Sequence, residues 1–390
     1  MKYCVLIVVL AICFSCKEKA PKELSIVVKN ELAIDRAFET IELTNSQLSS
    51  LSSSFYKVID DQTGAEQITQ HIDKDEDGKT DVLLFQPSVS AKSQKVYTII
   101  PTTKAEIDST NIRCYSRFVP ERTDDYAWEN NRVAFRTYGP TAQKMKEEGV
   151  PGGTLSSGMD AWLKRVEYPI INKWYEKYTS GAGTYHEDTG EGLDNFHVGV
   201  SRGVGGTAVK VDTVYFISKN FVSYKTITNG PIRTSFILEY GTWNAGELQL
   251  TETKHISLDY GQNLSRHTVN MKGADTLSVG ITLHKKDGAI TTNEKAGWMS
   301  YWESFDDSAL GQGFVVKGDS CLIGFDKYIT DQKDQSNLYA HLRLNDNSIT
   351  YYAGFGWRKS GQFNNKEEWE AYLNQFSECL KNPLIVTINN

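Results

Sequence analysis

The sequence predicts a mostly β protein, with a small N-terminal β-sandwich followed by a large antiparallel β-sandwich. Short runs of alternating or β-branched residues recur along most of the chain, and polar turns separate them. Apolar residues at helical spacing occur at only two places. The length of 390 residues fits two domains, or one large all-β domain together with a small one.

Residues 1–15 have the features of a secretory signal peptide. Lys2 precedes an apolar run from Cys4 to Phe14, and the small residue Ser15 follows that run. The run is too short to cross a bilayer, which takes about 20 apolar residues. No other segment of the sequence is apolar enough to cross one.

Cys16 stands where a bacterial lipoprotein carries its lipid, although Cys13 occupies a position at which that motif usually has leucine. Polar residues begin directly at Lys17, which favours a lipoprotein over a simple cleaved signal with an incidental cysteine. Acyl chains would hold the mature protein on a membrane surface. We therefore expect a periplasmic or cell-surface protein that is lipid-anchored to the outer membrane, with residues 16–23 as a tether.

The strand-like runs of the first region predict a small β-sandwich domain over residues 24–110. They are short and are spaced as in hairpins: Leu24–Val28, Phe38–Leu43, Phe55–Ile59, Asp81–Phe85 and Val96–Ile100. Polar stretches at 101–108 and 120–126 mark the boundary with the next region.

The second region, residues 120–385, continues the β pattern with longer connections and predicts a large antiparallel sandwich. Its runs are Arg132–Tyr138, Val209–Ile217, Arg233–Tyr240, Lys254–Asp259, Ser265–Met271, Leu277–Leu283, Gly313–Val316, Tyr339–Leu344 and Ser348–Phe355. The spacing of apolar residues predicts helices over 159–174, interrupted at Pro169, and over 364–380. Asn364 or Asn365 is the expected cap of the second helix.

Composition excludes several functions. The net charge of −7 without a basic stripe makes nucleic acid an improbable partner. Cys114, Cys321 and Cys379 form neither a disulfide framework nor a zinc motif. Sequence motifs of nucleotide enzymes and zinc metalloproteases are absent. An aromatic content of 11% is common in extracytoplasmic proteins that bind carbohydrate, because sugar rings lie on aromatic faces.

The stretch 185–206 carries the most chemistry. It contains Tyr185, His186, Asp194, His197 and Arg202 among several glycines. Such a glycine content disfavours a helix and predicts an irregular loop that feeds a strand. Acid and base groups on a loop indicate a binding or catalytic site. The alternative is a surface turn with solvated charges.

The stretch 73–81 resembles the start of a calcium loop. Asp73, Asp75, Asp77 and Asp81 supply carboxylates, and Gly78 occupies the position of the sharp turn. The closing glutamate and the flanking helices of an EF-hand are missing. A structural Ca²⁺ site and a polar hairpin held by local aspartate hydrogen bonds are both consistent with the pattern.

Several further residues are candidates for binding the substrate, and each could instead have a purely structural or solvated role. Arg136 and Tyr138 share one face of a predicted strand, and Arg136 is otherwise a solvated arginine. Asp160 and Lys164 share a helix face, with Trp162 off that face, and otherwise form a surface ion pair. The remaining two are Arg233, at the start of a strand, and Trp357, near a glycine-rich strand end.

Four of these segments together resemble a family found in the polysaccharide-degradation loci of marine bacteria, one branch of which is the ulvan oligosaccharide dehydratase. They are 129–140, 160–164, 185–206 and 229–233. The resemblance covers most of residues 24–380. It implies a galactose-mutarotase-like supersandwich and the elimination of water from the non-reducing-end uronic acid of an oligosaccharide, which gives a 4,5-unsaturated sugar without a catalytic cofactor.

This reaction needs a cation for the uronate carboxylate, a base for the C5 proton and an acid for the C4 hydroxyl. Arg202 is the expected carboxylate partner, with Arg136, Arg233 or Lys164 as alternatives. His186 and Tyr185 are the expected acid/base pair, with His197 as the competitor. A sugar epimerase or mutarotase is the alternative reaction, and a glycan-binding lipoprotein is the alternative without catalysis.

Overall fold

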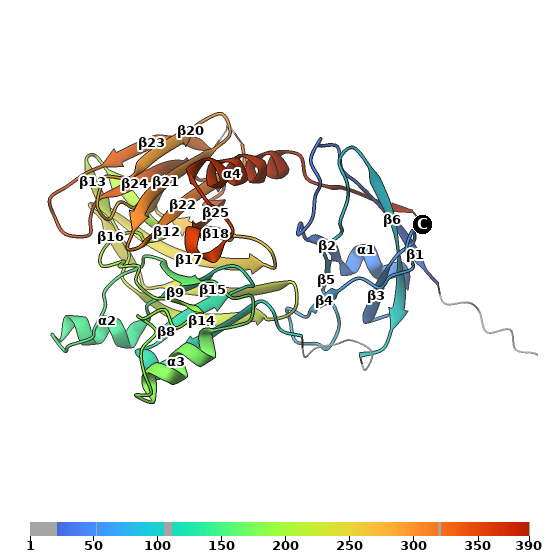
Figure 1. Ribbon diagram of the computed structural model, residues 1–390, viewed down its shortest axis with the longest axis horizontal. Coiled ribbons are helices and arrows are strands. Elements are labelled where there is room, and N and C mark those ends of the chain that lie inside the picture. Colours follow the sequence, from blue (N-terminus) through green and yellow to red (C-terminus); the bar gives the residue numbers. More distant parts are fainter. Residues whose placement is uncertain (1–21, 52, 105–110, 319–320, 390) are drawn as a thin grey trace, which may run out of the picture.

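The computed structural model describes residues 22–51, 53–104, 111–318 and 321–389. The expected signal peptide and Cys16 lie outside these residues. The fold is mostly antiparallel β and is built from several sheets, as the sequence predicts (Figure 1). Within the described residues, no helix has the length and apolar character that crossing a membrane requires.

The small sandwich consists of two sheets with the orders β26-β1-β6-β3 and β2-β5-β4. Alternate residues of β1 and β3 are buried, so one face of the first sheet supplies Ile26 and Val58 to a core shared with the second sheet. The elements are β1 (Leu24–Lys29), β2 (Ile41–Thr44), α1 (Asn45–Leu48), β3 (Phe55–Asp60), β4 (Thr69–Ile72), β5 (Val82–Phe85), β6 (Gln94–Thr102) and β26 (Ile385–Asn389).

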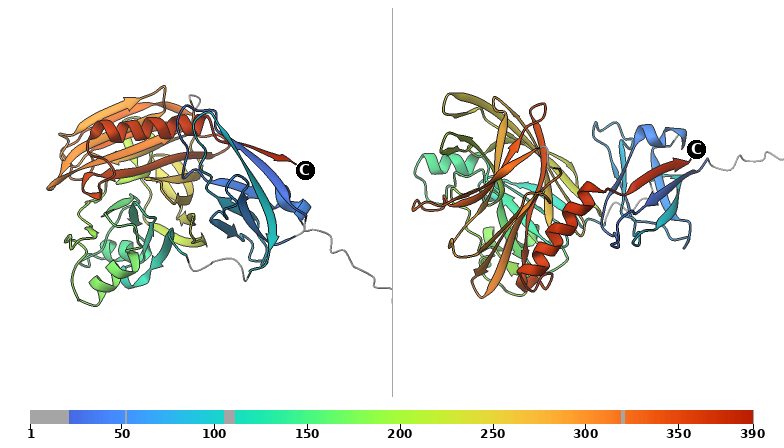
Figure 2. Two further views of the ribbon diagram at one scale, coloured as in Figure 1. Left: turned by 45° about the vertical axis from the view of Figure 1, so that its right-hand side comes forward. Right: turned by 90° about the horizontal axis from the view of Figure 1, so that it is seen from above.

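The end of the chain returns to the small sandwich. Strand β26 pairs antiparallel with β1, and Val27 lies opposite Thr387 (Figure 2). The range 24–110 drawn from the sequence therefore leaves out one strand of this sheet. A five-residue strand at the chain end carries no local signal of its partner, because sheet pairing is a long-range contact.

The large sandwich contains three sheets. Their orders are β11-β10-β9-β8-β7, β13-β12-β19-β24-β23 and β14-β15-β17-β18-β25-β22-β21-β20, the last with β16 attached to β17. The first strands are β7 (Tyr115–Val119), β8 (Asp125–Glu129), β9 (Ala134–Thr137), β10 (Asp160–Lys164), β11 (Gly192–Leu193), β12 (Val204–Val211), β13 (Val214–Phe216), β14 (Phe221–Thr228), β15 (Arg233–Tyr240) and β16 (Trp243–Ala245). The others are β17 (Leu248–Asp259), β18 (Leu264–Lys272), β19 (Thr276–Thr282), β20 (Ala289–Asn293), β21 (Trp298–Phe305), β22 (Ser308–Val316), β23 (Leu322–Tyr328), β24 (Asn337–Arg343) and β25 (Ser348–Trp357).

The nine-stranded sheet, which contains β17, β18 and β25, is the scaffold of the large sandwich. One of its faces packs on both five-stranded sheets: Phe236 and Phe355 meet the β8–β9 sheet, and Val269 and Tyr351 meet the β12–β19 sheet. We call the opposite side its outer face. Helix α4 (Lys366–Lys381) lies across part of the outer face (Figure 2).

Helix α4 follows the sequence prediction closely. The Asn365 side chain accepts a hydrogen bond from the Glu368 backbone N–H, so Asn365 is the cap. Trp369 and Leu373 are buried against β22. A Cβ atom on Gly311 or Gly313 would collide with these side chains, so the glycines let the helix approach the sheet.

The predicted helix over 159–174 is wrong. Residues Asp160–Lys164 form strand β10, which is buried throughout, and helix α3 spans Ile171–Thr179. A short run that is buried on both faces has no strand alternation and is easily mistaken for a helix. The remaining helix, α2, spans Pro140–Glu147.

Candidate active site

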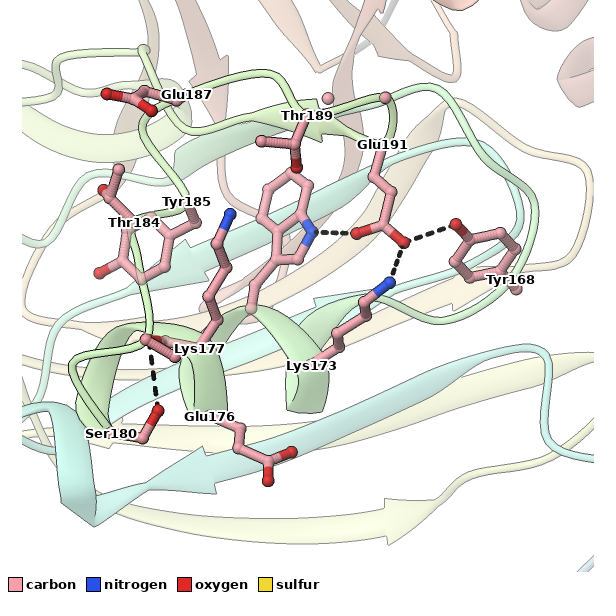
Figure 3. A pocket seen from close by; sticks show the side chains of 14 residues that line it. Tyr168, Lys173, Glu176, Lys177, Ser180, Thr184, Tyr185, Glu187, Thr189 and Glu191 are labelled. Atoms are coloured by element: carbon pink, nitrogen blue, oxygen red, sulfur yellow. Dashed lines mark hydrogen bonds and ion pairs between the residues drawn. The ribbon is translucent and has the colours of Figure 1, made fainter.

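The loop between α3 and β12 is irregular, as the glycines predict, and positive φ angles occur at Gly190, Gly192 and Gly199. Two hollows border it. We call the first the histidine pocket, a cavity of about 650 Å³ that includes His186 and His197 in its lining. The second is an open groove of about 600 Å³ along α3 (Figure 3).

His186 is held in an orientation that suits a base. Its Nδ1 atom lies 2.7 Å from the backbone oxygen of Asp194. A carbonyl oxygen only accepts, so Nδ1 carries the proton of this hydrogen bond and Nε2 of the neutral ring keeps its lone pair. The side chain is 51% exposed, which leaves the ring accessible from the pocket.

His197 also lies at the pocket and does not point into the core of the sandwich. Its side chain is 60% exposed, and its Nε2 atom lies 2.9 Å from Oδ2 of Asp334. Gly199 has a φ of 52°, and a Cβ atom there would collide with the Asp334 carboxylate. The glycine therefore makes room for the contact between this loop and the segment that carries Asp334.

Arg136 forms the floor of the histidine pocket and is already neutralised. Its Nη2 atom lies 2.6 Å from Oδ2 of Asp160 and 2.8 Å from Oδ2 of Asp194, and its Nη1 atom lies 3.6 Å from Oδ2 of Asp125. Tyr138 donates a 3.0 Å hydrogen bond to Asp160. These buried groups form one network that supports the loop rather than a free cation for a ligand.

Burial dominates the electrostatics of this network. It raises the pKa of Asp125 to about 6, against the opposing effect of Arg136. Burial also raises the pKa of Asp160 and of Asp194. Three carboxyl groups around one guanidinium therefore hold protons more readily than they would in water.

Tyr185 does not share the lining of the histidine pocket. It is 2% exposed and packs among Trp162, Tyr175 and Tyr178, and it borders the groove along α3 (Figure 3). Arg136 donates a 3.3 Å hydrogen bond to its hydroxyl. Burial raises its pKa. Tyr185 therefore contacts Arg136 and His186 without lining the histidine pocket. Its ring centroid lies 4.7 Å from that of His186.

The expectation that Arg202 clamps a carboxylate is wrong. Arg202 is 1% exposed and donates to Ser157 Oγ, to the Thr207 oxygen and to the Val200 oxygen. Burial lowers its pKa. Its side chain fills the space beside Gly280, where a Cβ atom would lie 2.5 Å from Arg202 Cγ. The guanidinium thus ties loop and sheet backbones together.

Four other expected binding residues lie elsewhere. Trp162 and Trp357 are buried in hydrophobic clusters. Lys164 is buried and pairs with Glu129 at 2.7 Å. Arg233 pairs with Asp259 at 2.6 Å and belongs to a different cavity. Burial of each side chain depends on partners distant in sequence, which local patterns do not reveal.

Three cationic side chains that the sequence did not suggest also line the histidine pocket. Arg122 comes from the polar stretch taken as a domain boundary, Lys146 from α2, and Lys333 from the segment between β23 and β24. None of them stands in a recognisable motif. Only the folding of three distant segments around the loop brings them together.

The candidate calcium loop is partly assembled. Asp73, Asp75 and Asp81 each offer an oxygen within 4.8 Å of the others, and these are ligands that Ca²⁺ prefers. Asp77 is outside this group and pairs with Lys79 at 2.7 Å. Three of the four expected aspartates therefore lie close enough to share one cation.

Sequence similarity links this chain to a protein family and to a relative from Formosa agariphila. A family model described as "Domain of unknown function (DUF4861)" matches residues 28–386. "Uncharacterized protein P7" of Formosa agariphila is 54% identical over 380 residues, which are 96% of this chain and 95% of that protein.

Two solved structures from Enterococcus faecalis are similar over 94% of this chain. A glycosyl hydrolase family 38 protein has 9% identity and a TM-score of 0.49, and an alpha-mannosidase has 8% and 0.43. The chain spans about half the length of these proteins, 47% and 46%. By the family match and the 54% identity, the chain belongs to the family described as domain of unknown function DUF4861.

Proposed function

We propose that the protein is a hydro-lyase that removes water from the non-reducing-end uronic acid of ulvan-type oligosaccharides and leaves a 4,5-unsaturated uronate. The observation that carries the proposal is His186, whose Nδ1 atom is fixed by the Asp194 backbone oxygen at the edge of a cavity of about 650 Å³. A positioned imidazole with a free Nε2 is a general base, and this volume suits a small ligand.

Two side chains of the histidine pocket can carry out the proton transfers of this reaction. Nε2 of His186 takes the C5 proton, the C5–H electron pair forms the C4=C5 bond, and the C4–O bond breaks. The departing hydroxyl takes a proton from His197 and leaves as water. Asp334 can accept the Nε2–H of a protonated His197 while Nδ1–H donates. Exchange with solvent then resets both histidines.

The uronate carboxylate gains charge as the C5 proton leaves, and cations must stabilise it. Arg136 is an unsuitable partner because three aspartates neutralise it. Arg122, Lys146 and Lys333 at the pocket wall are the better candidates. Of these, Arg122 has the planar fork that matches a carboxylate.

Mass spectrometry of uronate-ended oligosaccharides before and after incubation tests the proposal. Elimination gives a product lighter by one water that absorbs in the ultraviolet. Unchanged mass with a new sugar configuration by NMR would instead show an epimerase or mutarotase. Binding without any covalent change would show a glycan-binding protein.

A variant pair tests the role of His186. His186→Ala should lower kcat by about 10²–10⁴-fold, the usual contribution of a general base. His255→Ala is the matched control, since His255 is an exposed histidine on the outer face of the nine-stranded sheet. Near-wild-type turnover in His186→Ala would move the base to His197.

A further inference from the structure

A further cavity, of about 680 Å³, lies between the two sandwiches, and we call it the interdomain pocket. Its walls are the segment before β2, the outer face of the nine-stranded sheet and helix α4. Polar contacts join these walls. Thr40 donates to Asp259 at 2.6 Å, and Arg233 donates to Glu42 at 2.7 Å. The pocket shares no lining residue with the histidine pocket.

Its cations divide into two groups. Arg36 and Arg233 are neutralised by Glu39 and Asp259. Arg132, Arg266 and Lys317 have no carboxylate within 4 Å among the described residues. The Nε atom of Arg266 is buried and lacks a hydrogen-bond partner in the part of the chain that the structure describes. Because Arg266 lines the pocket without a carboxylate partner, its guanidinium is available to an anionic group that enters the pocket.

An aromatic surface adjoins these cations. Arg266 of β18 lies opposite Tyr352 of β25 in the sheet register, and the Tyr352 ring packs edge-on against Phe376 of α4. Phe38 also lines the pocket and has a φ of 62°, a strained conformation for a bulky residue. Its backbone oxygen accepts from Gln262 Nε2 at 2.7 Å, which helps hold this conformation. Such strain is often retained where a side chain serves a ligand.

Aromatic faces beside unpaired guanidinium groups suit a sugar ring that carries an anionic group. The ring's C–H face packs on an aromatic side chain, and the anion accepts charged hydrogen bonds. The geometry points to the interdomain pocket as a second carbohydrate-binding site, for a sulfated or carboxylated sugar unit, with Arg266 and Lys317 as its anion partners. The site does not depend on the reaction proposed at His186.

Calorimetric titration with three matched sugars tests this site. Glucose 6-sulfate, glucuronate and glucose differ only at C6, as sulfate ester, carboxylate and hydroxyl. Wild-type protein should bind at least one of the two anionic sugars more tightly than glucose. Arg266→Met should weaken that binding about tenfold, and Lys317→Met, at an exposed position where folding is not at risk, should weaken it several-fold. Arg358→Met, at an exposed arginine outside the described pockets, should bind as wild type.

Arg122→Met separates the two pockets. It removes a cation of the histidine pocket and should leave the Arg266-dependent binding unchanged, whether or not the protein is a hydro-lyase. Equal affinity for all three sugars, or wild-type binding by both Arg266→Met and Lys317→Met, would overturn the proposal. A titration with inorganic sulfate completes the test. If sulfate bound and neither anionic sugar did, the pocket would hold a bare anion only, and the proposal would be overturned.

Discussion

Replacing Arg202 should damage folding rather than chemistry. Its guanidinium donates three hydrogen bonds, to buried oxygens of Ser157 and Thr207 and to a partly buried oxygen of Val200. Hydrogen bonds from a charged group contribute about 1.5–3 kcal/mol each. Removing the arginine also removes its own desolvation cost, so we expect Arg202→Ala to lower the free energy of unfolding by about 3 kcal/mol.

The consequence can be measured as a melting temperature. A loss of about 3 kcal/mol should lower the Tm of a domain of this size by about 6–12 °C. Circular dichroism during heating gives this value, with Arg343→Ala, at an exposed arginine at the end of β24, as the control. Turnover per folded molecule should stay within about twofold of wild type. An unchanged Tm together with a large loss of turnover would refute the structural role and return Arg202 to the substrate.

Three further outcomes are expected. Burial holds the pKa of Asp125 at about 6, above its ordinary 3.8, so this group stabilises the fold at low pH and the contribution is lost as pH rises through 6. The part of the loss due to Asp125 is about 1 kcal/mol of unfolding free energy between pH 5 and 7, and Asp125→Asn should lose that much less than the wild type, as urea unfolding at both pH values would show; an equal loss in the two proteins would contradict it. Ca²⁺ should raise the Tm of the wild type and not of Asp75→Asn, and a calcium-insensitive wild type would favour the polar hairpin. Growth with radiolabelled palmitate should label the wild type and not Cys16→Ser, and an unlabelled wild type would exclude the lipid anchor.

Local patterns in the sequence were sufficient for many elements. The alternation between Arg233 and Tyr240 predicts β15 with its observed ends. The apolar stripe and asparagine cap predict α4 to within about two residues. These features depend on neighbours within a turn or a strand, so they are readable without the fold. Strand β10 was misread because burial on both faces removed its alternation.

The glycine-rich loop with His186 was also recognisable from the sequence, because acid and base groups stand close together in it. The partners of these groups were not. His197 meets Asp334, and Arg122 and Lys333 reach the same cavity from segments far apart in the sequence.

The sequence by itself determined the β class, the capped helix and the loop that carries the histidines. Each of these follows from residue patterns within one strand, helix or loop. Only the tertiary structure decided which charges face a cavity. It buried Arg202 against backbone oxygens and paired Lys164 with Glu129, while Arg266 was left without a carboxylate partner among the described residues. The physical reason is that the surroundings of a charge are set by side chains and backbone from distant segments, and burial or pairing there outweighs what the neighbouring residues suggest.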